Sequence, residues 1–333
     1  MKKQIIAAAV AASVSAVAMA DISINGDAKY EYLYTDNSDG TTTNQGNTEM
    51  HLNITGKTGD TTVVIKTEID TSETASSSAD AGDDGFDIED MYLTTKVGDI
   101  TVKGGSWASG TTALLGEIDN GSRTYNRVEL GTSVAGVKLY AGNVGRAQSE
   151  GFSNYREDMY AGAQFSVAGQ NVHLKRLGDD VEGFGLSGET NGLKYRVEQK
   201  NGAGTNTDVT FAEIGTTVNG MGISYAMIDA DAANLVGEND SSIFAVEMGL
   251  ISATTEDAQQ QVTVNTSLDG NALTFKMGTI ENGISSGVDL DYTQLAASRP
   301  LASGAKATVT WTDKDTGAAS STETFEIDLS VSF

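Results

Sequence analysis

The end of the chain shows a strict alternation of apolar and polar residues, with apolar side chains at Phe325, Ile327, Leu329, Val331 and Phe333. A two-residue period predicts a β-strand with one apolar face and one polar face. Such a strand fits the last strand of a soluble sandwich, and it fits equally a strand with one face in lipid and one in water. This segment alone leaves both folds open.

The same alternation recurs along most of the chain. It begins at residues 22–34, where the apolar face carries three tyrosines, and it returns in the segments 50–54, 63–69, 137–139, 193–197, 273–277 and 307–311. The first of these segments exceeds the roughly 9–11 residues that a tilted strand needs to cross a bilayer. The sequence therefore predicts an all-β chain.

The connections between these strands are of two kinds, which alternate along the chain. The short ones lie at 56–59, 97–99, 135–136, 168–169, 191–192, 219–220 and 269–270, and longer polar ones separate them. Short turns on one rim and long loops on the other are typical of a transmembrane antiparallel β-barrel. We favour about 16 strands, with a weak hairpin around 178–192 left out, over the alternative of 18, in which 229–258 is one long loop.

The N-terminal segment has the organisation of a secretory leader. Met1 is followed by two lysines, residues 5–17 are apolar or small, and Ala18-Met19-Ala20 forms a small-x-small cleavage site. We predict a signal peptide at 1–20 and one β-barrel domain at 21–333. The chain has no Cys, which excludes disulfides and thiolate metal sites.

Charge limits the partners. The chain has 21 Lys and Arg against 46 Asp and Glu, and the leader holds two of the lysines and no acid, so the mature formal charge is −27. Such acidity argues against nucleic acid as a partner. Carboxylates crowd at Asp80, Asp83, Asp84, Asp87, Glu89 and Asp90, and again at Asp229, Asp231, Glu238 and Asp240. These stretches could bind Ca²⁺, although we favour a solvated acidic rim and expect no cofactor and no metal site.

Enzymatic chemistry finds no support in the sequence. The Gly-x-Ser-x-Gly and His-Glu-x-x-His motifs are absent, and His51 and His173, the two histidines, both fall on the polar faces of predicted strands. We expect the protein not to be an enzyme.

The leader, the first strand, the segment KVGDITVKGGSW (96–107) and the terminal Phe333 together resemble the Gram-negative general porins. The resemblance implies a homotrimer in outer-membrane lipid that lets small hydrophilic solutes and ions diffuse passively. It also implies that Phe333 is the recognition signal for the outer-membrane assembly machinery.

In that family the third long loop folds into the lumen and narrows it, and the third long connection here is 107–123. By resemblance, Glu117 and Asp119 would lie at the constriction. Lys29, Lys66 and Lys103 fall on the polar faces of their strands and resemble the basic wall that faces the acidic loop. An ordinary acidic surface loop and simply solvated lysines are the alternatives.

Two other functions compete with a diffusion channel. The abundance of Gly and Thr, the acidity and the lack of Cys also suit a secreted structural or adhesive β-protein. The alternation of short and long connections, the terminal Phe and the lack of a fixed repeat favour the channel. A substrate-specific porin would need a ladder of aromatic or densely charged residues, and the chain has two Trp. The acidic long loops lead us to expect a preference for cations.

Overall fold

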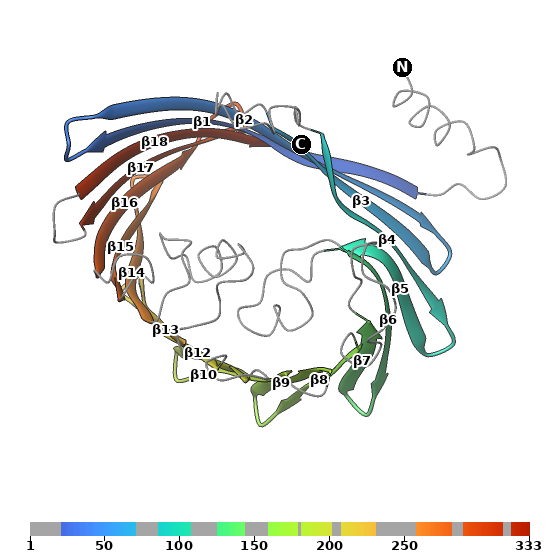
Figure 1. Ribbon diagram of the computed structural model, residues 1–333. Coiled ribbons are helices and arrows are strands. Elements are labelled where there is room, and N and C mark those ends of the chain that lie inside the picture. The colour runs from blue at the N-terminus through green and yellow to red at the C-terminus, as the bar shows by residue number, and fades with distance from the viewer. Residues whose placement is uncertain are drawn as a thin grey trace, which may run out of the picture.

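The computed structural model describes residues 21–70, 86–107, 125–143, 159–178, 181–201, 208–230, 258–281, 289–315 and 321–333, and these form a single antiparallel barrel (Figure 1). The strands are β1 (Asp21–Asn37), β2 (Thr42–Thr58), β3 (Thr61–Asp70), β4 (Asp87–Val97), β5 (Ile100–Trp107), β6 (Tyr125–Val134), β7 (Val137–Asn143), β8 (Met159–Val167), β9 (Gln170–Leu177), β10 (Val181–Thr190), β11 (Leu193–Asn201), β12 (Val209–Val218), β13 (Met221–Ala230), β14 (Ala258–Leu268), β15 (Asn271–Glu281), β16 (Leu290–Pro300), β17 (Lys306–Asp315) and β18 (Ser321–Ser332). Within these ranges no helix is long and apolar enough to cross a membrane.

The described residues form an 18-stranded barrel, so the expectation of 16 is wrong. The hairpin that the lower count left out is real, because β10 pairs with β9 on one side and with β11 on the other. The alternation in β10 is weak because glycines interrupt it. One of them, Gly188, lies beside the side chains of Gln170 on β9 and Tyr195 on β11, and a Cβ there would meet the Tyr195 Oη at 2.9 Å. Residues 231–257 lie outside the described part of the chain.

The short turns follow the sequence prediction closely. Five of them are two-residue turns with positive φ at both positions: Ala135-Gly136, Ala168-Gly169, Asn191-Gly192, Asn219-Gly220 and Asp269-Gly270. In the third, φ is 51° at Asn191 and 79° at Gly192. This geometry matches the twist of a β-hairpin, and Gly in the second position adopts it without a steric penalty.

The two faces of the barrel wall differ in chemistry. Side chains on the concave inner face crowd together, whereas those on the convex outer face spread apart, so exposure separates the two sets. Ile24, Met91 and Leu329 are 62, 51 and 47 % exposed, whereas Asp90 and Lys175, of opposite parity, are 3 and 7 % exposed. The outer face is therefore apolar and the inner face charged, as the alternation predicts.

Tyrosines brace the inner face by lying across glycines of the next strand. Tyr160 of β8 lies over Gly142 of β7 and donates a hydrogen bond to Glu129 of β6, with an O···O distance of 2.8 Å. Tyr292 of β16 spans Gly278 in the same way to reach Gln261 of β14, also at 2.8 Å. Each glycine makes room for a ring that ties three strands together, which is a known way to support glycine in a sheet.

The barrel closes where the two ends of the described chain meet. β1 pairs with β18 from Asp27↔Ser332 to Asn37↔Thr322. Beyond that ladder, the Gly26 amide donates to the Phe333 carbonyl at 3.0 Å, and the Phe333 amide donates to the Gly26 carbonyl at 2.9 Å. Phe333 therefore completes the closing pair of strands.

Candidate functional site: the inner face of the barrel

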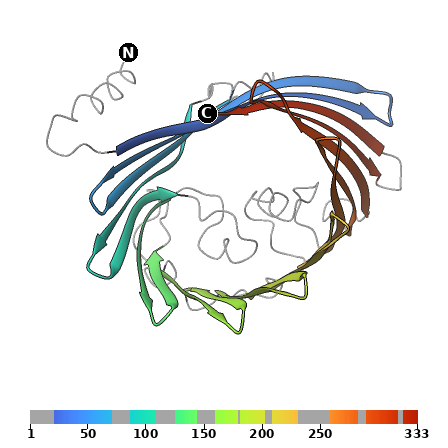
Figure 2. The ribbon, with the colours of Figure 1, turned by 180° about the vertical axis from the view of Figure 1, so that it is seen from behind.

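The inner face carries an acidic region over β18 and β1–β4, which adjoin at the closure (Figures 1 and 2). We call this the acidic arc, and it consists of Glu326, Asp328, Asp27, Glu31, Glu49, Glu68, Asp70, Glu89 and Asp90. The neighbours Glu89 and Asp90 both belong to it because the register of β3 and β4 shifts by one residue here, which brings Glu89 to Glu68. The register brings these carboxylates from five strands onto one continuous surface, because neighbouring strands place their inward residues opposite one another. Because it concentrates negative charge, this surface attracts cations.

Two of the predicted lysines lie within this acidic arc. The Lys29 Nζ lies 2.8 Å from the Glu31 Oε2 and 3.6 Å from the Glu49 Oε2. The Lys66 Nζ lies 2.6 Å from an oxygen of Asp90, whose side chain is 5 % exposed. Both lysines therefore face inward as predicted, but each is paired with carboxylates, and their part in a constriction stays a prediction.

Basic side chains gather on the next part of the wall, from β5 to β11. We call this region the basic arc, and it consists of Lys103, Arg127, Lys138, Lys175, Lys194, Arg196 and Lys200. Its strands β7–β11 lie across the barrel from β1, β2 and β18 in both ribbon views (Figures 1 and 2). Glu129 and Glu198 lie among these cations, but the basic side chains outnumber them, so the two facing walls differ in net charge.

Lys103 belongs to a cluster of cations and aromatic rings. Its Nζ lies 4.0 Å from the centre of the Tyr92 ring and 4.2 Å from that of Trp107. The Arg127 guanidinium lies 4.0 Å from the centre of the same Trp107 ring, and it donates a hydrogen bond to the Trp107 carbonyl at 3.0 Å. Stacking of this kind stabilises a cation that is partly removed from water.

Gly105 explains why Tyr92 can approach this cluster. Its φ is +138°, and a Cβ there would meet the Tyr92 Cα at 2.6 Å. Trp107 is the last residue of β5, so the cluster holds the strand end from which the predicted constriction loop departs. Residues 108–124 lie outside the described part of the chain, and with them Glu117 and Asp119.

The two histidines lie on opposite arcs. His51 is on β2 within the acidic arc, where its Nδ1 is 3.2 Å from the Asp27 Oδ2. His173 is on β9, where its Nε2 is 2.6 Å from the Tyr140 Oη and 3.3 Å from the Gln164 Nε2. Both face inward, as the alternation predicts.

Part of the acidic stretch 80–90 lies in a strand of the barrel wall, although the sequence predicted an acidic loop there. Asp87, Glu89 and Asp90 lie in β4, and Asp90 is buried against Lys66. The remaining carboxylates of this stretch, and Asp231, Glu238 and Asp240 of the second, lie outside the described ranges. Calcium binding by these stretches stays an open alternative.

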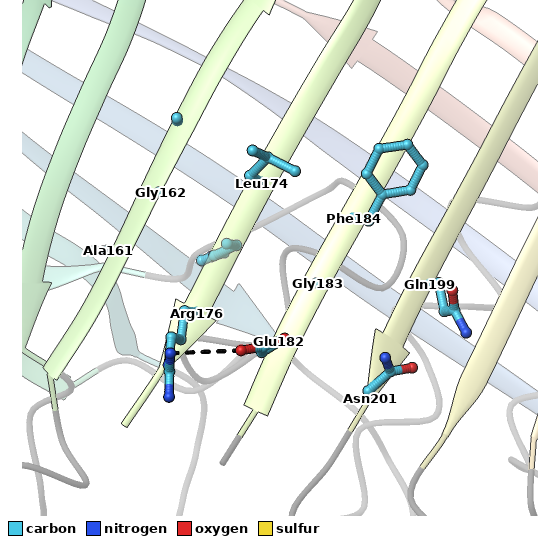
Figure 3. Close-up of a pocket in the computed structure, with 11 residues that line it drawn as sticks. Ala161, Gly162, Leu174, Arg176, Glu182, Gly183, Phe184, Gln199 and Asn201 are labelled. Carbon is cyan, nitrogen blue, oxygen red and sulfur yellow. Dashed lines mark ion pairs between the residues drawn. The ribbon is translucent and has the colours of Figure 1, made fainter. Parts of the chain in front are cut away.

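A hollow of about 470 Å³ crosses β8–β11 (Figure 3). Leu174 and Phe184, which line it, are 42 and 41 % exposed and have the parity of the outer face. The Arg176 Nη1 and the Glu182 Oε1 lie 3.5 Å apart beside it. Most of its lining side chains therefore belong to the outer face, and none of the predicted site residues is among them.

Comparison with solved structures places this architecture among known proteins. OpdL of Pseudomonas aeruginosa superimposes with a TM-score of 0.64 at 12 % identity, over 94 % of this chain and 99 % of that one. The outer membrane protein opdK of the same organism gives 0.58 at 12 %, over 93 and 98 %, and OccAB4 of Acinetobacter baumannii gives 0.59 at 10 %, over 94 and 98 %. The chain shares their fold. No protein-family model and no curated protein matches the sequence.

Sequence analysis missed the separation of charge into two arcs. Parity assigns each charged residue to a face, but only the register says which charges are neighbours. Lys29, Lys66 and Lys103 have the same parity signal, yet the first two lie among carboxylates and the third between aromatic rings.

Proposed function

We propose that this chain is an outer-membrane porin that forms a water-filled channel for passive diffusion of small hydrophilic solutes and ions. The closed barrel with an apolar outer face and a charged inner face carries the proposal. A closed barrel leaves no strand edge unpaired in lipid, where each unsatisfied backbone group is costly. A water-soluble protein would gain nothing from so large an exposed apolar surface.

The location and maturation of the protein are part of this proposal. The leader 1–20 directs export and is removed, the domain 21–333 inserts into the outer membrane of a Gram-negative bacterium, and Phe333 serves as the signal for the assembly machinery. Its closing position opposite Gly26 supports that role, because a terminal strand that completes the barrel is needed for insertion. Trimer formation, as in the general porins, is a further element of the proposal.

We also propose that the channel prefers cations. The mature charge of −27 and the acidic arc support this preference, because both raise the local concentration of cations. The basic arc opposes it at short range. Surface charge acts over about 8 Å at physiological ionic strength, so the preference should weaken as salt shortens this reach.

Planar-bilayer conductance of the purified protein tests the proposal. A channel gives stepwise openings with a linear relation between current and voltage. The competing function, a secreted structural or adhesive β-protein, gives no openings and leaves the protein in the soluble fraction. No enzymatic activity is part of the proposed function.

A further inference from the structure

The acidic arc contains an imidazole with a carboxylate on each side. His51 contacts the Asp27 Oδ2 through its Nδ1 at 3.2 Å and the Glu49 Oε1 through its Nε2 at 2.9 Å. A third carboxylate belongs to Glu68, which is the cross-strand partner of His51 on β3. Ligand atoms of Glu49, His51 and Glu68 all lie within 4.8 Å of one another.

We propose that Glu49, His51 and Glu68 bind a divalent transition-metal ion, for which Zn²⁺ is the probe, on the inner wall of the barrel. Zinc accepts nitrogen and carboxylate ligands at about 2.0–2.2 Å, so two donors on one ion are separated by roughly 3 to 3.5 Å. The observed distance of 2.9 Å between the His51 Nε2 and the Glu49 Oε1 is close to that separation. A small movement of the Glu49, His51 and Glu68 side chains would bring all three ligand atoms to this separation.

The surroundings of His51 orient it for this role. A neutral imidazole donates one hydrogen bond only, and Asp27 accepts it at Nδ1. Nε2 then faces the Glu49 Oε1; it can carry a proton that this carboxylate accepts, and a metal ion that replaces the proton takes the same position between the two groups. A carboxylate behind a ligating histidine is the usual arrangement in metal sites, because it fixes the tautomer and raises the basicity of the ligand.

Glu49 is oriented in a similar way. Its Oε2 faces the Lys29 Nζ at 3.6 Å, while its Oε1 faces His51. The nearby Lys66 is engaged at 2.6 Å by Asp90. Lysines thus hold carboxylates at the edge of the site, and one oxygen of Glu49 stays directed at the imidazole.

The ligand set also selects among metals. Calcium and magnesium prefer all-oxygen sites, whereas imidazole suits zinc, copper and nickel. A second group of close acids, Glu31, Glu326 and Asp328, lacks an imidazole and therefore offers no such selectivity. A dication at His51 would cancel part of the negative charge of the acidic arc, and the lumen would become less attractive to cations.

Calorimetric titration of the folded, detergent-solubilised mature protein with Zn²⁺ tests the proposal. We expect a one-to-one site whose affinity falls at least tenfold in His51→Asn and in Glu68→Gln. Asp27→Asn should weaken it by about 10- to 100-fold, the usual effect of losing the carboxylate behind a ligating histidine. His173→Asn is the matched control, because His173 also faces inward but lies beside Tyr140 and Gln164.

Nonspecific Zn²⁺ binding by the other carboxylates is the same in every variant. The test is therefore the difference in Zn²⁺ affinity between His51→Asn and His173→Asn. Equal Zn²⁺ binding in these two variants would overturn the proposal, as would displacement of Zn²⁺ by an equal concentration of Ca²⁺. Retained heat-modifiable mobility on gels shows that each variant is folded. Because the assay measures binding and no ion flow, its failure would leave the proposed channel intact.

Discussion

The contact between Tyr140 and Gly162 offers a sharp test of how the barrel wall is held together. In the register, Tyr140 of β7 lies opposite Gly131 on one side and opposite Gly162 on the other. Its ring leans toward Gly162 alone, and its hydroxyl reaches His173 on β9 at 2.6 Å. The two glycines therefore have the same partner but different surroundings.

A methyl group at Gly162 would overlap this ring. Its position lies 2.7 Å from the Tyr140 Cε1, with the hydroxyl and Cζ closer still, and all three are side-chain atoms. Tyr140 must then rotate away and lose its hydrogen bond. Overpacking costs about 1–3 kcal/mol and a lost neutral hydrogen bond about 1 kcal/mol, so we expect Gly162→Ala to destabilise the barrel by about 2–4 kcal/mol.

Gly131→Ala is the matched control. Among the described residues, a Cβ there has the Leu139 carbonyl as its one close neighbour, at 3.8 Å, which is an ordinary contact. Alanine in a strand also has less conformational entropy to lose than glycine, so this variant should be neutral or more stable by about 0.5–1 kcal/mol. The two substitutions change the chain identically and differ only in the position of the ring.

Urea unfolding in lipid vesicles, followed by tryptophan fluorescence, measures both free energies. The cost of Gly162→Ala should largely disappear in a Tyr140→Ala background, since no ring remains to be displaced. Equal stabilities of the two glycine variants, or an unchanged cost in that background, would refute the reasoning.

Three other predictions address the membrane assignment and the channel. Deletion of Phe333 removes two backbone hydrogen bonds to Gly26, so we expect precursor or unfolded chain to remain in the periplasm. The control variant Ser332→Ala should assemble normally. Normal amounts of heat-modifiable deletion variant in outer-membrane fractions would contradict the prediction. Single cysteines at Ile24, Leu139 and Leu329 should resist aqueous thiol reagents and those at Lys29, Lys66 and Lys194 should react; uniform labelling would argue against a membrane barrel. The reversal potential in a KCl gradient should indicate cation preference at low salt and a smaller one near 1 M, and Glu117→Gln with Asp119→Asn should reduce it. An anion preference at low salt would refute the charge argument, and an unchanged preference in the double variant would remove 107–123 from the constriction.

The sequence predicts those features that depend on local patterns. The two-residue period assigns Ile24 and Leu329 to the outer face, and Asn191-Gly192 identifies a hairpin, because both signals lie within a few neighbouring residues. The strand count failed where the local signal is weak. The β9–β10 connection is short and β10 is rich in glycine, so neither a long loop nor a clear alternation marks this hairpin.

Features that depend on pairing between strands could not be predicted. Asp27, His51 and Glu68 form one row only because the register aligns β1, β2 and β3 at these positions, and a shift by one residue would move His51 to the outer face. The contacts between tyrosines and the glycines beneath them depend on the register in the same way. Neither Tyr160 nor Gly142 is distinctive in the sequence, and their contact follows from β7 and β8 being aligned.

The closure between β1 and β18 has a consequence for the order in which the barrel folds. Among the described strands, every other pairing joins neighbours in the chain, so each hairpin forms by closing a short segment at small entropic cost. The closing pair instead joins β1 and β18, which lie far apart in the sequence, so its larger loop-closure cost favours its formation after the others. Until then both edge strands are open, and inward carboxylates at Glu31, Glu326 and Asp328 repel the corresponding edge of another chain. Lys29 lies 2.8 Å from Glu31 on the same strand and offsets part of this repulsion, in the open edge as in the closed barrel.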